Sequence, residues 1–327
     1  MKVTTAIIVL NWNGADETME CLASLYRMMN SFYIVVVDNG SVDNSVPRIL
    51  NFLRQEGIKH RNLKIGDKLI TEPLEKECIV YESGENPGFA KGNNAGVRLL
   101  VSFPPDRYLL LNNDTIVEPD FLDHLVSFET EHPEYVALTP LICYNNPRTL
   151  VWNAGGKQFF GLRKYNYAKR SINEIREQDH IPVTFLTGCA LYFGQNVLTD
   201  DGVPLTERFF FGEEDFDFCL RMNESHKKMA CVLRSKIYHK VSASVQNKDS
   251  VGRVYINTLN RFIDLRLHWP LFLFLLWTIC YIPHLQFLML RRNHGFRASM
   301  LTPWRVFIQS FRQETVTHED FIAASNL

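Results

Sequence analysis

The chain has 327 residues, of which 46% are hydrophobic and 22% are charged, and its formal net charge is −1. This length can form one large domain, or one domain with an appendage, and the composition supplies ample material for a core. The balanced charge gives no electrostatic reason to expect nucleic acid as a partner. The seven cysteines are scattered, odd in number and without a CxxC pair, which favours reduced thiols over a disulfide framework.

The first 145 residues alternate between short apolar runs and segments with helical spacing. The apolar run at 6–10 is too short for the core of a signal peptide, so we interpret it as a first strand. Further strands are predicted at 33–37, 78–81, 108–111 and 136–142, and helices at 19–29, 43–53, 89–100 and after Pro119. Residues 57–77 are charged and aperiodic, and we interpret them as a surface insertion. The alternation predicts an α/β fold with a doubly wound, mostly parallel sheet.

Polar residues come directly after three of these strands, at 11–13, 38–39 and 112–114. Each group alone could be turn or helix-cap chemistry. The carboxyl ends of parallel strands meet at one edge of a sheet, so three groups there indicate a binding site. Asp114 is also a hard oxygen ligand of the kind that Mg²⁺ and Mn²⁺ prefer. Neither GxGxxG after the first strand nor GxxxxGK[ST] is present, which disfavours a dinucleotide-binding domain and a P-loop NTPase.

The second half is richer in aromatic residues and contains an acidic segment at 213–217. Its four carboxylates could form a solvated first helical turn, or could serve a cation or a proton-accepting task. On a helix, Glu214, Asp217 and Arg221 would share one face. Strands are predicted at 229–233 and 237–240. His239, at the end of the second, is either structural or a metal ligand.

Seven segments resemble, in order, a family 2 glycosyltransferase of the GT-A fold, in its rhamnosyltransferase-like branch. They are AIIVLNWNG, VVVDNGSVDNS, ENPGFAKGNNAGVR, YLLLNNDTIVEPDFL, LTGCALYFGQNVL, FFFGEEDFDFCLRM and IYHK, and the resemblance covers about residues 4–245. It implies a Rossmann-like GT-A catalytic domain over 1–247. Residues 1–145 would form its nucleotide-sugar-binding half and 146–247 its acceptor-side half. The remaining residues, 248–327, would form a helical, membrane-associating tail.

The resemblance also implies roles for individual residues. Nucleotide contacts fall to Leu10, Trp12, Asp38, Lys91, Asn94, Asn112 and Asn113, with Trp12 and Asp38 near the base. Asp114 and His239 would hold Mn²⁺ or Mg²⁺, and Asp215 would be the general base. Gly188, Cys189, Glu214 and Asp217 are assigned to the substrate pocket, together with the aromatic run 209–211. Asn113-Asp114 replaces the family's Asp-x-Asp, so an amide of Asn112 or Asn113 would make the ribose contact.

The implied reaction transfers a sugar, with inversion, from a nucleoside-diphosphate sugar to a hydroxyl of a glycan or lipid-linked acceptor. A UDP- or dTDP-linked donor and a role in bacterial surface polysaccharide synthesis are expected. One alternative is a non-catalytic nucleotide-sugar-binding or assembly protein, which the missing first carboxylate keeps open. Another is a sugar nucleotidyltransferase. It is disfavoured because NWNGADET after the first strand contains no basic residue.

The tail contains an uncharged stretch, 270–290, which as a helix would be roughly 31 Å long. Pro283, His284 and Gln286 interrupt it, and Trp269, Trp277 and Tyr281 resemble interfacial aromatic residues. Three readings remain: a monotopic or re-entrant anchor, a helix buried against the catalytic domain or a second subunit, and a true span. From Arg253 onward there are eight Arg, four acidic residues and no Lys. We expect contact with a membrane surface through 250–312, on the cytoplasmic face, and a possible homodimer.

Overall fold

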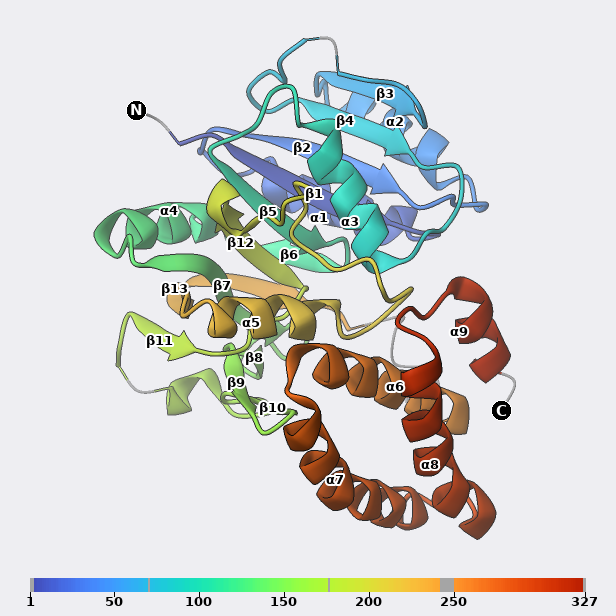
Figure 1. Ribbon diagram of the computed structural model, residues 1–327. Helices are drawn as coiled ribbons and strands as arrows, with labels where there is room; N and C mark the ends of the chain where they lie inside the picture. Colours follow the sequence, from blue (N-terminus) through green and yellow to red (C-terminus); the bar gives the residue numbers. More distant parts are fainter. Residues whose placement is uncertain (1–2, 70, 176, 242–249, 326–327) are drawn as a thin grey trace.

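The computed structural model describes residues 3–69, 71–175, 177–241 and 250–325 (Figure 1). Its centre is a large mixed sheet whose main path runs β11-β13-β7-β12-β5-β1-β2-β4-β3. Five of these strands are mutually parallel: β1 (Thr5–Asn11), β2 (Phe32–Asp38), β3 (His60–Lys64), β4 (Cys78–Glu82) and β5 (Arg107–Asn112). β1 lies between β2 and β5, so the carboxyl ends of all three meet at one edge, as predicted.

The remaining strands extend the sheet with mixed directions. They are β6 (Thr115–Val117), β7 (Tyr135–Tyr144), β8 (Val151–Asn153), β11 (His180–Val183), β12 (Ala190–Gly194) and β13 (Lys228–His239). β12 runs antiparallel to both β5 and β7, and β13 runs parallel to β7 and antiparallel to β6. A separate hairpin is formed by β9 (Gly156–Phe159) and β10 (Leu162–Tyr165), and 3₁₀ turns occur at Ile172–Glu174 and Gln195–Val197.

Helices cover both faces of the sheet, which confirms the predicted doubly wound architecture. α1 (Ala15–Leu25), α2 (Ser45–Gln55) and α4 (Phe121–Glu131) contribute to one buried apolar cluster, together with Ile7 of β1. α3 (Phe89–Leu99) and α5 (Glu214–Glu224) contribute to the other, together with Ile8. Successive β1 residues thus enter opposite cores, because strand side chains alternate between faces. A strand buried on both faces reads as an unbroken apolar run.

The local structure differs from the predictions at four places. Residues 57–77 contain the edge strand β3, whose half-exposed polar residues gave no apolar pattern. β6 was not predicted, and the runs 229–233 and 237–240 belong to one strand, β13, whose register shifts between Val232 and Lys236. Met29 was expected to face inward but is 83% exposed, because α1 ends at Leu25 and the chain turns before Met29.

The described part of the tail is helical and lies below the sheet in Figure 1. It consists of α6 (Val251–His268), α7 (Leu271–Arg291), α8 (Phe296–Arg312) and α9 (His318–Ser325). α6 is buried along most of its second half and packs against α8 and α9, and α7 packs against α8. The backbone N–H of Phe210 donates to the carbonyl of Val316 at 2.8 Å, which ties the tail to the segment before α5.

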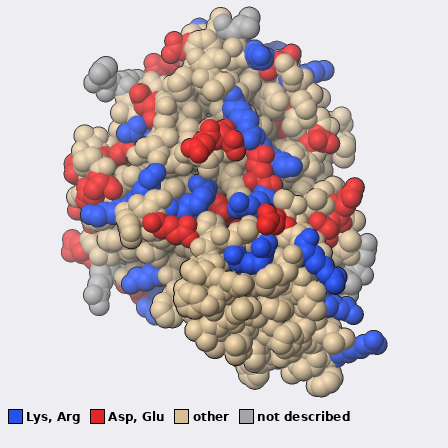
Figure 2. All heavy atoms as spheres, in the orientation of Figure 1, with Lys and Arg blue, Asp and Glu red and all other residues tan. Residues whose placement is uncertain are grey.

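α7 buries one face and exposes the other. Among the described residues it is the one helix long and apolar enough to cross a membrane. Only 28% of its most apolar 18-residue stretch is buried. Trp277, predicted as an interfacial aromatic, is instead buried and donates its indole N–H to the carbonyl of Phe160 at 3.1 Å. Phe272 and Ile279 on the opposite face are exposed. Figure 2 shows this broad uncharged surface, with Lys and Arg along one border.

Candidate active site

A cleft of about 790 Å³ opens at the carboxyl ends of β1 and β5. Most of the predicted site residues line it: Leu10, Trp12, Asn112, Asn113, Asp114, Gly188, Cys189, Glu214, Asp215 and His239. These residues come from both halves of the predicted catalytic domain, and residues of the tail close part of the wall. The topology therefore brings together residues that are far apart in the sequence.

Asp114 and His239 meet because of the pairing between two strands. β13 pairs antiparallel with β6 so that His239 lies opposite Thr115, and the N–H of Lys240 donates to the carbonyl of Asp114 at 2.9 Å. This register places His239 Nε2 3.0 Å from Asp114 Oδ1. The His239 ring is buried against Trp152, with 4.6 Å between centroids, and within the described part of the chain its Nδ1 has no hydrogen-bond partner. Packing, rather than an acceptor behind the ring, therefore holds the imidazole.

The chemistry of this pair fits a divalent cation. A carboxylate oxygen and an imidazole nitrogen are ligands that Mn²⁺ accepts, and both side chains line the cleft. Mg²⁺ is usually held by one or two protein groups and completed by water and substrate phosphates. Two protein ligands at the edge of an open cleft leave room for such phosphates.

Asp215 lies in the first turn of α5 and is held from two sides. The backbone N–H of Gly188 donates to its Oδ2 at 3.3 Å, and Arg163 donates to its Oδ1 at 3.3 Å. Burial raises the pKa of Asp215, and the positive charge of Arg163 opposes that rise. A Cβ on Gly188 would lie 3.2 Å from the ring of Phe89, so a larger residue there would require that ring to shift by a few tenths of an ångström. Asp215 is thus an oriented carboxylate facing the cleft.

The two glutamates before Asp215 have opposite electrostatic surroundings. Glu213 is 5% exposed and accepts a hydrogen bond from Arg261 of α6 at 2.5 Å. Although its burial favours the neutral form, the charges of Arg261 and Arg163 lower the pKa of Glu213. Burial and the charge of Asp215 raise the pKa of Glu214 to about 8. Glu213 is therefore no solvated first-turn residue, and Arg261, predicted on the polar face of its helix, is buried.

Of the two residues predicted near the base, Trp12 lines the cleft and Asp38 does not. Trp12 lines the cleft with 57% of its surface exposed. Asp38 is buried and lines a separate cavity of about 330 Å³. Its Oδ1 accepts from Asn11 at 2.7 Å and from the hydroxyl of Ser41 at 2.6 Å, and its Oδ2 accepts from the Ser41 N–H at 2.9 Å. Asp38 therefore shapes the loop beside the cleft.

The two asparagines before Asp114 also have structural partners. The side-chain amide of Asn113 donates to the hydroxyl of Thr18 at 3.0 Å, which fixes the first turn of α1 beside the cleft. The carbonyl of Asn112 accepts from the hydroxyl of Thr115 at 2.7 Å and stabilises the turn that carries Asp114.

The structure does not bring Lys91, Asn94 or Asp217 to the cleft. Lys91 is exposed on α3. The amide of Asn94 donates to the carbonyl of Leu205 at 2.8 Å and to Glu207 at 2.9 Å, so it holds a distant loop. Asp217 pairs with Arg221 at 2.8 Å, and neither lines the cleft, although both are on the same helix as Glu214. In the aromatic run 209–211 only Phe211 lines the cleft.

Several residues of the cleft were not predicted. Trp152 and Arg163 come from the second half, and Arg253, Asn257 and Arg292 come from the tail. Arg253 stacks over the ring of Phe211, with 4.6 Å to its centroid. These positions follow no sequence motif, because they come from elements that are far apart in the chain and meet only in the fold.

Residues 6–194 match the model of glycosyl transferase family 2. No curated protein matches in sequence. Three solved structures have a similar fold. They are GalNAc-T7 with UDP, GalNAc and Mn²⁺ (TM-score 0.54, 12% identity, 83% of this chain and 53% of that chain), the mannosyltransferase PcManGT from Pyrobaculum calidifontis in complex with GDP-Man and Mn²⁺ (0.53, 12%, 100% and 80%), and S. aureus TarS (0.50, 16%, 81% and 40%). The chain thus spans less than half of TarS. The family match covers more than half of this chain, which therefore belongs to glycosyl transferase family 2.

Proposed function

We propose that the protein is an inverting, metal-dependent glycosyltransferase. Its donor would be a nucleoside-diphosphate sugar, and its acceptor a hydroxyl of a glycan or lipid-linked saccharide. One observation carries the proposal: the pair Asp114 and His239 and the candidate base Asp215 line the same cleft. An activated sugar between them would meet a cation site on its leaving-group side and a base on its acceptor side.

The donor would bind along the wall formed by β1 and the turn after β5. The exposed ring of Trp12 offers a stacking face for the base, and Asn112 and Asn113 line the path toward Asp114. We infer a UDP- or dTDP-linked donor. When bound, a divalent cation held by Asp114 and His239 would neutralise the charge that develops on the diphosphate leaving group. Because Lys91 and Asn94 lie outside the cleft, we assign no donor contact to them.

Asp215 would take the proton of the acceptor hydroxyl as that oxygen attacks the anomeric carbon. Attack from the side opposite the diphosphate inverts the configuration. Glu213 is committed to Arg261, and the raised pKa of Glu214 keeps it neutral at pH 7, so Asp215 is the carboxylate suited to this task. The Gly188 N–H and Arg163 would hold Asp215 in place.

We further propose that the tail places the enzyme on the cytoplasmic face of a membrane. The exposed apolar residues of α7 and α8 would enter the headgroup region, and the arginines beside them would contact anionic lipids. These residues include Phe272, Ile279, Phe287, Trp304 and Ile308, with Arg291, Arg297 and Arg305. The packed face of α7 supports a monotopic arrangement over a span. Since Arg253 and Arg292 line the cleft, this geometry suits a lipid-linked acceptor that carries phosphate.

The resemblance in sequence supports a rhamnosyltransferase-like role in bacterial surface polysaccharide synthesis. Pairing of two copies through the exposed helices is the alternative use of the same apolar surface.

Calorimetric titration with UDP, dTDP, GDP and CMP, each with and without Mn²⁺, tests the donor site. We expect one uridine or thymidine diphosphate to bind only when Mn²⁺ is present. Asp114→Ala should abolish that binding. Asp200→Ala, which removes an exposed carboxylate outside the cleft, should retain it. If the folded protein binds none of the four nucleotides, the assembly-protein alternative is favoured instead.

A further inference from the structure

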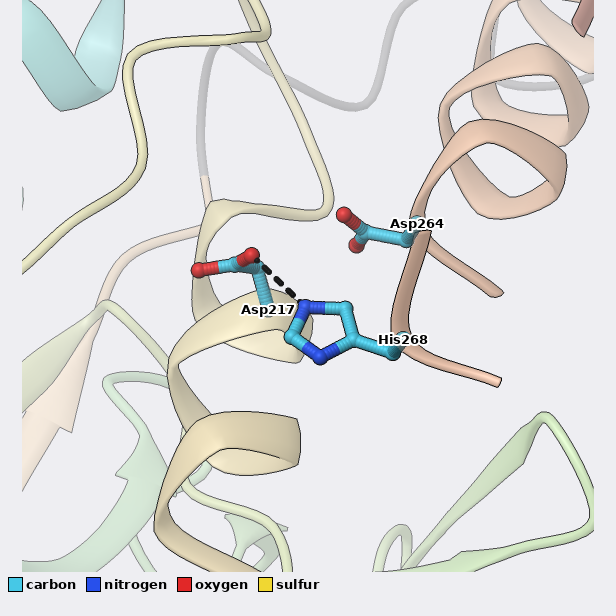
Figure 3. Close-up of side chains that lie close together, drawn as sticks. All are labelled: Asp217, Asp264 and His268. Carbon is cyan, nitrogen blue, oxygen red and sulfur yellow. Dashed lines mark hydrogen bonds and ion pairs between the residues drawn. The ribbon is translucent and has the colours of Figure 1, made fainter. Parts of the chain in front are cut away.

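Three ionisable side chains meet where the tail joins the catalytic domain. Asp217 comes from α5, and Asp264 and His268 come from α6 (Figure 3). One ligand atom from each lies within 4.8 Å of the other two. None of the three lines the catalytic cleft, so this cluster is separate from Asp114 and His239.

Asp264 is the unusual member of the cluster. Its side chain is fully buried and points toward Asp217 in Figure 3, and neither carboxylate oxygen has a hydrogen-bond partner among the residues that the structure describes. Burying an ionised carboxylate without a partner is costly. A protonated carboxyl would still need an acceptor for its O–H, and the described residues provide none. A bound cation would satisfy both oxygens.

His268 is oriented as a metal-binding imidazole would be. Its Nδ1 lies 3.0 Å from both carboxylate oxygens of Glu224, and its Nε2 lies 3.1 Å from Oδ1 of Asp217. A carboxylate that accepts the Nδ1 proton leaves the Nε2 lone pair directed at the cluster, which is the usual arrangement behind a histidine ligand.

Asp217 is held so that one oxygen remains for the cluster. Arg221 donates to its Oδ2 at 2.8 Å, which turns Oδ1 toward His268. Arg208 also approaches Oδ1, at 3.5 Å. The Arg208 side chain is 41% exposed, so it can turn into solvent when a cation takes its place.

We propose that Asp217, Asp264 and His268 bind a Zn²⁺ ion that fastens α6 to α5. Carboxylate oxygens and an imidazole nitrogen are ligands that Zn²⁺ uses, and a water would complete four-coordination. The two carboxylates balance the charge of the ion. The role of this site would be structural: the ion would join α5, which carries Asp215 in its first turn, to α6, which carries Arg261 beside Glu213. The inference does not depend on the proposed function.

The main test measures zinc in the full-length chain by inductively coupled plasma mass spectrometry. All proteins carry Asp114→Ala, which removes the other candidate metal site. After incubation with ZnCl₂ and dialysis against metal-free buffer, we expect one zinc per chain. Adding Asp264→Asn or His268→Gln should lower the zinc retained per chain at least tenfold, whereas Asp200→Asn should not change it.

The melting temperature is a second readout of the same site, and it requires no dialysis step. We expect ZnCl₂ to raise the melting temperature of the Asp114→Ala protein, and Asp264→Asn to remove that rise. Two results would overturn the proposal: no zinc retained by the folded parent, or zinc retained equally by Asp264→Asn and His268→Gln. Should Asp264→Asn fail to fold, the comparison between the Asp114→Ala parent and His268→Gln still tests the proposal. Neither readout measures transfer or nucleotide binding.

Discussion

Arg261 of the first tail helix donates a hydrogen bond to Glu213, the residue immediately before the helix that carries Asp215. The same guanidinium donates to the carbonyl of Gly161 at 2.6 Å and lies 3.8 Å from the centroid of Phe216. The tail is therefore part of the framework of the site, and a deletion of 250–327 would disturb the catalytic domain itself.

Removing this buried arginine should destabilise the whole protein. In Arg261→Ala, the buried Glu213 would keep only the more distant Arg163, at 3.7 Å, and loss of one partner of a buried pair costs about 3–5 kcal/mol. Arg48→Ala, which removes an exposed ion pair with Asp16, should cost less than about 1 kcal/mol. Urea unfolding of both variants measures the difference. Equal midpoints would show that the Arg261–Glu213 pair contributes nothing.

Asp215→Asn and Glu214→Gln should differ strongly in their effect on transfer, although the two carboxyl groups are neighbours in the sequence. Asn cannot accept the hydroxyl proton, so Asp215→Asn should lower kcat by about 10²–10⁴-fold while donor binding stays unchanged. Glu214 is neutral at pH 7 because its pKa lies near 8, so Gln is a close imitation, and transfer should stay within a few-fold. Steady-state kinetics and calorimetry with the donor nucleotide measure both. Retained transfer in Asp215→Asn would reject the base assignment.

Arg163 should set the acid limb of the pH–rate profile. Its positive charge lowers the pKa of Asp215, which burial raises. Without that charge, Asp215 would hold its proton to higher pH, so in Arg163→Gln the rise of kcat should move to more alkaline pH. Arg163→Lys should keep the wild-type position because it keeps the charge. A uniform loss of rate at all pH values would instead indicate a purely structural role.

Glu214 should make the protein less stable as pH rises from about 4.5 to about 8. In this window the unfolded chain has released the Glu214 proton while the folded chain retains it, because its folded pKa is near 8. The free energy of unfolding then falls with pH, by at most about 1.4 kcal/mol per unit from this group. Urea unfolding at several pH values should show a flatter dependence in Glu214→Gln. The same slope in both proteins would contradict the burial of this proton.

Charge placed on the exposed face of α7 should release the protein from membranes. Ile279→Asp puts a carboxylate where the proposal places lipid, whereas Ile65→Asp changes an equally exposed residue of the nucleotide-side half. We expect co-flotation with phosphatidylglycerol vesicles to fall only in Ile279→Asp. Binding of wild-type protein should also weaken as salt rises, because arginines contribute. Unchanged flotation of Ile279→Asp would show that this face is not the attachment surface.

The central strands and the edge they share were predictable because a parallel sheet buries both faces. Unbroken apolar runs such as β1 then end abruptly in polar residues, and Asp114 stands at such an end. β3 was not predicted, because an edge strand needs no continuous apolar run. Asn94 resembles a ligand residue by motif, yet its amide is used by Leu205 and Glu207. Arg163, Arg253 and Arg261 depend on contacts between elements, which no local pattern encodes.

The buried aromatic side of α7 has a consequence for membrane attachment. Phe274 and Trp277 are packed beside Phe262 of α6, so this side of the helix is not available to lipid. In the monotopic arrangement proposed above, only the exposed face of α7 would contact the bilayer. Attachment would then leave the packing between α6 and α7 intact and could be reversible. The fraction of enzyme at the membrane would then vary with the supply of anionic lipid.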